Sequence, residues 1–269
     1  MSTTGGKGTI MFVHGLWLTP KSWEHWIPRF EGLGYEVLAP AWPGVAELDE
    51  PHDPDKAPAD IGVGEIVDHY VSILGGLDAK PIVVGHSFGG LIAEILNDRG
   101  LATAVVALSP APAKGVYRLP IASLRTASVA LRNPANRHRA VKYTLEDFHY
   151  TMTNTLTLEE SEPYYERYAI PAAGPIFFEG AMAELNPHTA SRVDFDRTDR
   201  APLLFVGFGQ DNVVPASVSK AITKKYQRSS AVTDYIEFPD RPHFPGVPGW
   251  EAVADQVLDW AKAHVPPAG

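Results

Sequence analysis

The sequence contains no cysteine among its 269 residues, and this absence removes several kinds of chemistry. Disulfide bridges, thiolate nucleophiles and zinc or iron–sulfur centres held by cysteine are all excluded. No apolar run approaches the roughly 18 residues that indicate a membrane-spanning helix, and residues 1–13 lack the pattern of a signal peptide. We therefore expect a cytoplasmic protein with no membrane partner.

Basic residues are also few. Lys and Arg number 23 against 32 Asp and Glu, and the net charge is −9. Nucleic acids and anionic membranes are bound mainly through Lys and Arg, so neither is expected as a partner. With 45% hydrophobic and 20% charged residues, the chain has the composition of an ordinary globular protein. Its length suits one large domain or a domain with an insertion.

Short apolar runs alternate with longer amphipathic stretches along much of the chain. The predicted strands are 9–13, 35–39, 81–84, 103–108, 202–207 and 232–238, and the predicted helices are 20–33, 61–77, 91–99, 215–226 and 250–264. Residues 43–60 are rich in Pro, Asp and Glu and predict an exposed loop. The alternation predicts an α/β fold in which a mostly parallel sheet of about six or more strands is flanked by helices.

This alternation pauses between residues 111 and 198. The region has no strand of similar quality and consists of helix-like segments, which we expect to be broken by prolines at 134, 163, 171, 175 and 187. The simplest organisation is an α/β core formed by residues 1–110 and 199–269. Residues 111–198 would then be a helical cap inserted after the fourth evident strand.

The run Gly85-His86-Ser87-Phe88-Gly89 lies between a predicted strand and a predicted helix. A serine on so tight a turn takes a strained backbone conformation, and the flanking glycines lack the Cβ atoms that would clash there. The hydroxyl of Ser87 then projects above the carboxyl end of the sheet. The pattern favours Ser87 as a nucleophile over a serine that merely caps the helix.

A serine hydroxyl needs a base to take its proton, and the base needs an acid to orient it. Asp211 follows the predicted strand 202–207, and His243 follows the last predicted strand. The chain order Ser87, Asp211, His243 is the order of an α/β-hydrolase triad. Asp240 is too close to His243 in sequence to be the favoured acid, and Asp234 lies within a predicted strand.

The loop after the first strand reads His14-Gly15-Leu16-Trp17. Acyl transfer needs two fixed N–H donors for the oxyanion. We expect them to be the backbone N–H groups of Phe88 and Leu16, and we expect His14 to brace the loop rather than to react.

These residues resemble the α/β-hydrolase family, in particular its small bacterial esterase, lactonase and cofactor-free perhydrolase branch. The resemblance covers nearly the whole core and implies Ser87 as nucleophile, His243 as base and Asp211 as its partner. It also implies Leu16 and Phe88 as the oxyanion hole. One or two edge strands common in the family are missing. Serine at position 87 argues against its dehalogenase and epoxide-hydrolase members, whose nucleophile is a carboxylate.

The expected partner is a small, uncharged ester, lactone or amide, because aromatic residues are frequent in the predicted cap. Trp17, Phe148 and Tyr150 are candidates for the substrate pocket, although ordinary packing of a small helical lid explains such aromatic residues better than dedicated recognition does. No cofactor or metal is expected, since the acidic run 47–53 is better explained as a solvated loop than as a cation site. Perhydrolysis, carbon–carbon hydrolysis, a lyase reaction or a non-enzymatic ligand receptor stay open as alternatives, and so does the oligomeric state.

Overall fold

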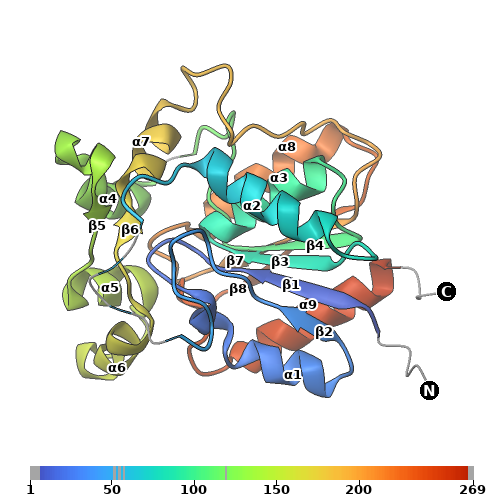
Figure 1. Ribbon diagram of the computed structural model, residues 1–269, viewed down its shortest axis with the longest axis horizontal. Coiled ribbons are helices and arrows are strands. Elements are labelled where there is room, and N and C mark those ends of the chain that lie inside the picture. Colours follow the sequence, from blue (N-terminus) through green and yellow to red (C-terminus); the bar gives the residue numbers. More distant parts are fainter. Residues whose placement is uncertain (1–6, 51–52, 54–55, 57, 119, 266–269) are drawn as a thin grey trace.

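The protein is described by a computed structural model that covers residues 7–50, 53, 56, 58–118 and 120–265. Parts of the predicted loop 43–60 lie outside these residues. Within them, six parallel strands form one sheet in the order β2-β1-β3-β4-β7-β8 (Figure 1). The strands are β1 (Thr9–Val13), β2 (Glu36–Leu38), β3 (Ile82–His86), β4 (Ala104–Leu108), β7 (Leu203–Phe208) and β8 (Thr233–Phe238). The predicted fold class is confirmed.

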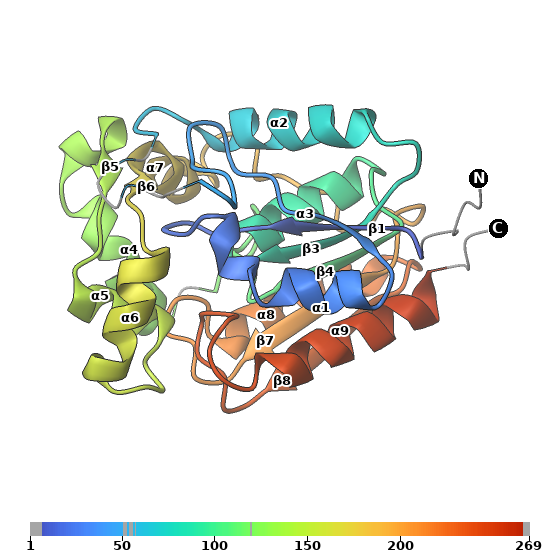
Figure 2. The same cartoon turned by 60° about the horizontal axis from the view of Figure 1, so that its bottom comes forward.

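Helices cover both faces of this sheet, as Figures 1 and 2 show. On one face lie α1 (Trp26–Gly32) and α9 (Trp250–His264); on the other lie α2 (Val63–Gly75), α3 (Phe88–Asp98) and α8 (Ala216–Lys225). Side chains alternate between the two cores along each strand: Met11 and Val13 face one, Ile10 and Phe12 the other. Because both faces of the central strands β1, β4 and β7 are buried, these strands read as continuous apolar runs.

The predicted helix 20–33 is in fact two elements. A 3₁₀ turn, η1 (Pro20–Trp23), precedes α1 and is capped by the Thr19 side chain. The apolar residues of both elements still share one buried face, because Trp23, Trp26 and Phe30 all pack around the ring of Phe12.

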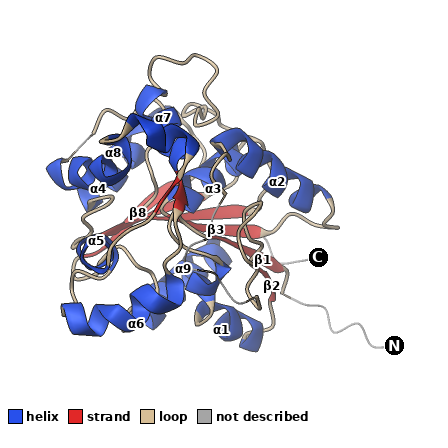
Figure 3. Cartoon of the chain, turned by 60° about the vertical axis from the view of Figure 1, so that its left-hand side comes forward, coloured by secondary structure: helices blue, strands red, loops and turns tan. Residues whose placement is uncertain are grey.

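The segment 111–198 joins β4 to β7, and its helices gather beyond the carboxyl ends of the strands (Figures 1 and 3). Its elements are α4 (Ile121–Leu131), η2 (Pro134–His138), β5 (Ala140–Val141), α5 (Leu145–Met152), α6 (Leu158–Tyr168), β6 (Ala172–Ala173) and α7 (Gly174–Met182). Two findings differ from expectation. The short strands β5 and β6 pair with each other, and α6 continues through Pro163. The hydrogen bond that Pro163 cannot make would have gone to the carbonyl of Glu159, which is exposed and can be hydrated.

A carboxyl group is buried in the core behind the sheet. Glu94 of α3 is 1% exposed, and its Oε2 accepts a hydrogen bond of 2.9 Å from the hydroxyl of Tyr226. Its Oε1 has no partner in the described part of the chain. The guanidinium of Arg200 lies over the Tyr226 ring, 4.9 Å from its centre. Burial raises the pKa of Glu94 to about 8, because an apolar environment disfavours the charged form.

This pKa makes stability depend on pH. The unfolded chain loses the Glu94 proton near pH 4.5, whereas the folded chain holds it up to about pH 8. Stability contributed by the neutral carboxyl is therefore lost as pH rises through this window. We expect Glu94→Gln, which is neutral and still accepts from Tyr226, to be more stable than the wild type at pH 8 by roughly 1–3 kcal/mol. Near pH 4.5 the two proteins should match. Urea unfolding at both pH values tests this, and equal stability at pH 8 would contradict it.

Candidate active site

Ser87 stands alone between β3 and α3, on the turn that joins them. Its backbone has φ 55° and ψ −120°, a left-handed conformation that is strained for any residue other than glycine. The turn is held by the Ser87 N–H, which donates to the Leu108 carbonyl at 2.9 Å. A Cβ on Gly85 would clash with the Gly89 carbonyl, and one on Gly89 would clash with the Val13 carbonyl. The predicted conformation of the turn is therefore confirmed.

Asp211 and His243 meet as a buried pair. Nδ1 of His243 lies 2.5 Å from Oδ2 of Asp211, and both side chains are fully buried. Because a carboxylate only accepts, Nδ1 carries the proton and Nε2 is left as the basic nitrogen. The second carboxylate oxygen accepts the N–H groups of Val213 (2.6 Å) and Val214 (2.8 Å), which fixes the carboxylate in place. Neither Asp240, which is exposed, nor Asp234, which accepts from Trp260, takes this position.

His243 lies against the turn that carries Ser87. Nε2 of His86 donates to the His243 carbonyl at 2.9 Å, and the two imidazole rings are 4.6 Å apart. Nε2 of His243 is buried and has no hydrogen-bond partner in the described chain, so Ser87 does not donate to it in this structure. Burial and the neighbouring His243 hold the pKa of His86 well below its usual range, so this ring stays neutral beside its neighbour. No sequence pattern around His86 predicts this role.

The loop after β1 packs directly on the serine. A Cβ on Gly15 would lie 3.0 Å from Cβ of Ser87. In the described part of the chain, neither the Leu16 nor the Phe88 backbone N–H donates to a protein acceptor, although both residues are buried. An oxyanion needs two unpaired donors of this kind, and the assignment of that role to Leu16 and Phe88 stays a prediction.

His14 braces this loop, as the sequence predicted. Its Nδ1 bonds to the Gly15 carbonyl at 3.0 Å, its Nε2 accepts from the Trp42 N–H at 3.3 Å, and the two rings stack. Burial lowers the pKa of His14 to about 4, so the ring is neutral at neutral pH.

The segment 111–198 is hydrogen-bonded to the loops that carry Asp211 and His243. The Phe244 N–H donates to the Met152 carbonyl at 2.9 Å. On the other loop, the Asn212 amide donates to the Tyr150 carbonyl at 2.9 Å, and the Val213 carbonyl accepts from Ser123 at 2.7 Å. Sequence reasoning missed these contacts, because they join residues 62 to 92 positions apart through backbone carbonyls, which carry no residue signature.

The three candidate pocket residues lie in different surroundings. Phe148 is fully buried between Tyr165 and Phe244. Tyr150 is partly exposed, with the Arg125 guanidinium 3.8 Å above its ring. Trp17 is 3% exposed and stacks on residues of the segment 111–198. Contact of any of the three with a substrate stays a prediction.

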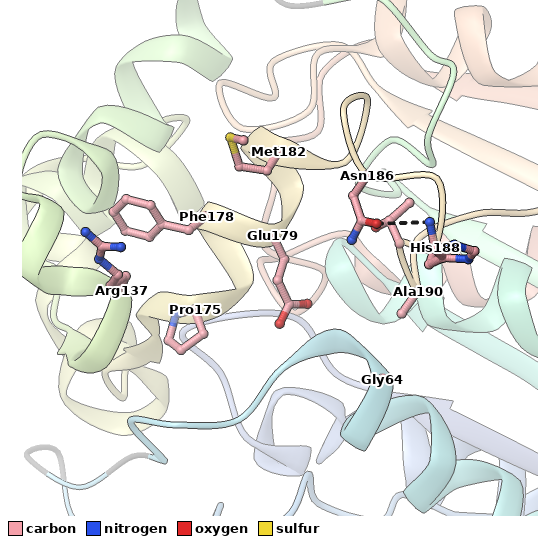
Figure 4. A pocket seen from close by; sticks show the side chains of 10 residues that line it. Gly64, Arg137, Pro175, Phe178, Glu179, Met182, Asn186, His188 and Ala190 are labelled. Carbon is pink, nitrogen blue, oxygen red and sulfur yellow. Dashed lines mark hydrogen bonds between the residues drawn. The ribbon is translucent and has the colours of Figure 1, made fainter.

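A groove of about 530 Å³ opens elsewhere, between the start of α2, helix α7 and the loop after α7 (Figure 4). Arg137 and Phe178 lie at one end of it and His188 at the other. Its central carboxylate, Glu179, already accepts the Val63 N–H at 3.0 Å. None of Ser87, Asp211 and His243 lines this groove, so it is separate from the candidate active site.

Among the described residues, no cluster of three or more His, Asp or Glu side chains is arranged to hold a metal ion. Nor does any helix in the described chain have both the length and the apolar character needed to cross a membrane.

Comparison with known proteins identifies the family to which this fold belongs. A sequence model of the alpha/beta hydrolase family matches residues 10–256. Among curated proteins, an epoxide hydrolase 2 of Siraitia grosvenorii is 29% identical over 96 residues, which is 35% of this chain and 28% of that protein. The match thus spans little more than a quarter of that relative's length.

Solved structures share the fold. A pyrethroid hydrolase from Sphingobium faniae JZ-2 matches with a TM-score of 0.67 at 20% identity, over 95% of this chain and 98% of that one. A monoacylglycerol lipase of Paleococcus ferrophilus matches with a TM-score of 0.65 at 22% identity, over 96% of both chains. Such low identities speak for the fold alone. Since the family model spans almost the entire sheet and its helices, this chain belongs to the alpha/beta hydrolase family.

Proposed function

We propose that this protein is a serine hydrolase that cleaves esters, lactones or amides of small apolar substrates through an acyl-enzyme. The observation that carries the proposal is the buried His243–Asp211 pair, whose unprotonated Nε2 belongs to a histidine held against the Ser87 turn. All catalytic groups in this proposal come from the chain itself. The curated relative is named an epoxide hydrolase, but a hydroxyl rather than a carboxylate stands at position 87, which favours acyl transfer.

The reaction would begin when Oγ of Ser87 attacks the substrate carbonyl carbon and its proton passes to Nε2 of His243. The Asp211 carboxylate stabilises the imidazolium that forms. The carbonyl oxygen becomes an oxyanion and accepts from the N–H groups of Leu16 and Phe88. His243 then donates its proton to the leaving oxygen or nitrogen, and the acyl-enzyme forms. Water, deprotonated by His243, releases the acid and restores Ser87.

In this scheme, substrate binding must bring the Ser87 hydroxyl within hydrogen-bond distance of Nε2 of His243. Ser87 and His243 are not hydrogen-bonded in the structure, and such catalytic bonds commonly tighten only in the complex with substrate. The segment 111–198, which lies over the carboxyl ends of the strands, would serve as the cap that closes this space. Its aromatic residues suit an uncharged acyl or alcohol group.

The nucleophile can be tested by labelling. We expect a fluorophosphonate to modify Ser87, and Ser87→Ala to lose both the label and about 10⁴-fold or more of p-nitrophenyl ester turnover. Ser161 offers a matched control: it also contacts a histidine, His149, at 2.9 Å, but it is fully buried and its hydroxyl donates to the Thr157 carbonyl. Ser161→Ala should label like the wild type. Unchanged turnover by Ser87→Ala would disprove the proposal, and parallel assays of carboxylic acids with peroxide would reveal perhydrolysis.

The acid can be tested through the histidine tautomer. In Asp211→Asn the single amide oxygen would be taken by the Val213 and Val214 N–H groups, which turns the NH₂ toward Nδ1 of His243. Nδ1 must then accept, so the proton moves to Nε2 and the base is lost. We expect kcat to fall about 10³–10⁴-fold, measured by ester hydrolysis. The exposed Asp240→Asn should hydrolyse at the wild-type rate, and equal losses in both variants would count against Asp211.

The pH profile gives an independent check. A protonated His243 cannot accept the Ser87 proton, so kcat/KM should fall on acidification with the slope of a single proton. Circular dichroism at each pH provides the control. A rate that increases toward low pH would rule out His243 as the base.

A further inference from the structure

Trp17 occupies an unusual place in the loop that follows β1. It is one residue beyond Leu16, its side chain is 3% exposed, and its backbone has φ 63°. This left-handed conformation is strained for a bulky residue and persists only where the surroundings impose it. The contacts of Trp17 therefore show what imposes it.

In the described part of the chain, the hydrogen bonds and ring contacts of Trp17 are four, and all of them come from the segment 111–198. The indole N–H donates to the Val141 carbonyl at 3.0 Å, and the Trp17 carbonyl accepts from the Ile170 N–H at 3.0 Å. The indole stacks on Tyr143, with ring centres 3.9 Å apart and planes at 16°, and lies 4.8 Å from the ring of Phe177. A core residue next to a proposed oxyanion donor is thus fixed by β5, β6 and α7 and their adjoining loops.

We propose that Trp17 is a positioning residue through which the segment 111–198 sets the oxyanion hole. This inference rests on the proposed function and assigns to that site a further residue. Without these four contacts the φ angle of Trp17 relaxes to negative values, and the peptide plane joining it to Leu16 rotates. The Leu16 N–H belongs to the preceding peptide unit, so this rotation would also move it relative to Ser87. The cap would therefore shape the catalytic groups as well as cover them.

The test uses sulfur in place of the substrate oxygen. A thionoester carries C=S instead of C=O, and the longer bond and weaker acceptor fit an intact oxyanion hole poorly. The wild type should therefore prefer the oxygen ester strongly. We expect Trp17→Ala to lower kcat for the best p-nitrophenyl ester by about tenfold or more, to leave KM within about threefold, and to reduce the oxygen-to-sulfur preference by a similar factor. A residue that only contacts substrate would change KM and leave the preference unchanged.

Two further variants keep the result interpretable. Trp17→Phe retains an aromatic ring and loses the bond to Val141, so a smaller change in the same preference is expected, and it carries the test if Trp17→Ala does not fold. Glu24→Gln is the matched control. Glu24 also joins the core to the segment 111–198, by accepting from Arg167 (2.6 Å) and Tyr168, but it does not touch the oxyanion loop. Its oxygen-to-sulfur preference should equal that of the wild type.

The outcomes separate the two proposals. A fluorophosphonate label on Ser87 of the wild type, together with a wild-type oxygen-to-sulfur preference in folded Trp17 variants, overturns the positioning role alone. Absence of the label and of ester turnover in the wild type overturns the proposed function and this inference with it. An equal reduction of the preference in Glu24→Gln also overturns the inference, because any loosening of the cap would then suffice.

Discussion

The turn between β3 and α3 is the constraint on which the rest of the site depends. Three backbone segments approach so closely there that neither Gly85 nor Gly89 has room for a Cβ atom. Ser87 between them is forced into a left-handed conformation, which separates its side chain from both the strand and the helix. The same close approach places the loop after β1 against Ser87. A Cβ at Gly89 would meet the Val13 and His14 carbonyls, so a substitution there would press on the serine turn and on the loop after β1 together.

The parallel sheet brings several loops to one edge but does not by itself fix their distances. Ser87 follows β3 and Asp211 follows β7, and β4 lies between these two strands in the sheet. His243 follows β8, the strand beside β7. Hydrogen bonds outside the sheet define how these loops meet. His86 holds the His243 carbonyl, and Met152 holds the next residue, Phe244.

Much of this architecture follows from local patterns in the sequence. The glycines at 85 and 89, on either side of Ser87, predict a tight turn. Continuous apolar runs such as 9–13 predict strands buried on both faces. The predictions fail where tertiary contacts outweigh propensity. Pro163 was expected to end a helix, yet α6 continues because the carbonyl left without a donor is exposed. Residues 20–33 have a helical apolar face, but a 3₁₀ turn occupies their first part.

The sequence by itself determined the fold class, the strained serine turn and the order of the candidate triad, because these depend on steric rules and on chain order. Only the tertiary structure decided which acid meets His243, since that pairing depends on loop geometry and not on spacing. It also decided the place of Trp17. Sequence marked this residue as a possible pocket wall, whereas its four contacts come from residues more than 120 positions away. Such contacts join elements that only the folded chain brings together.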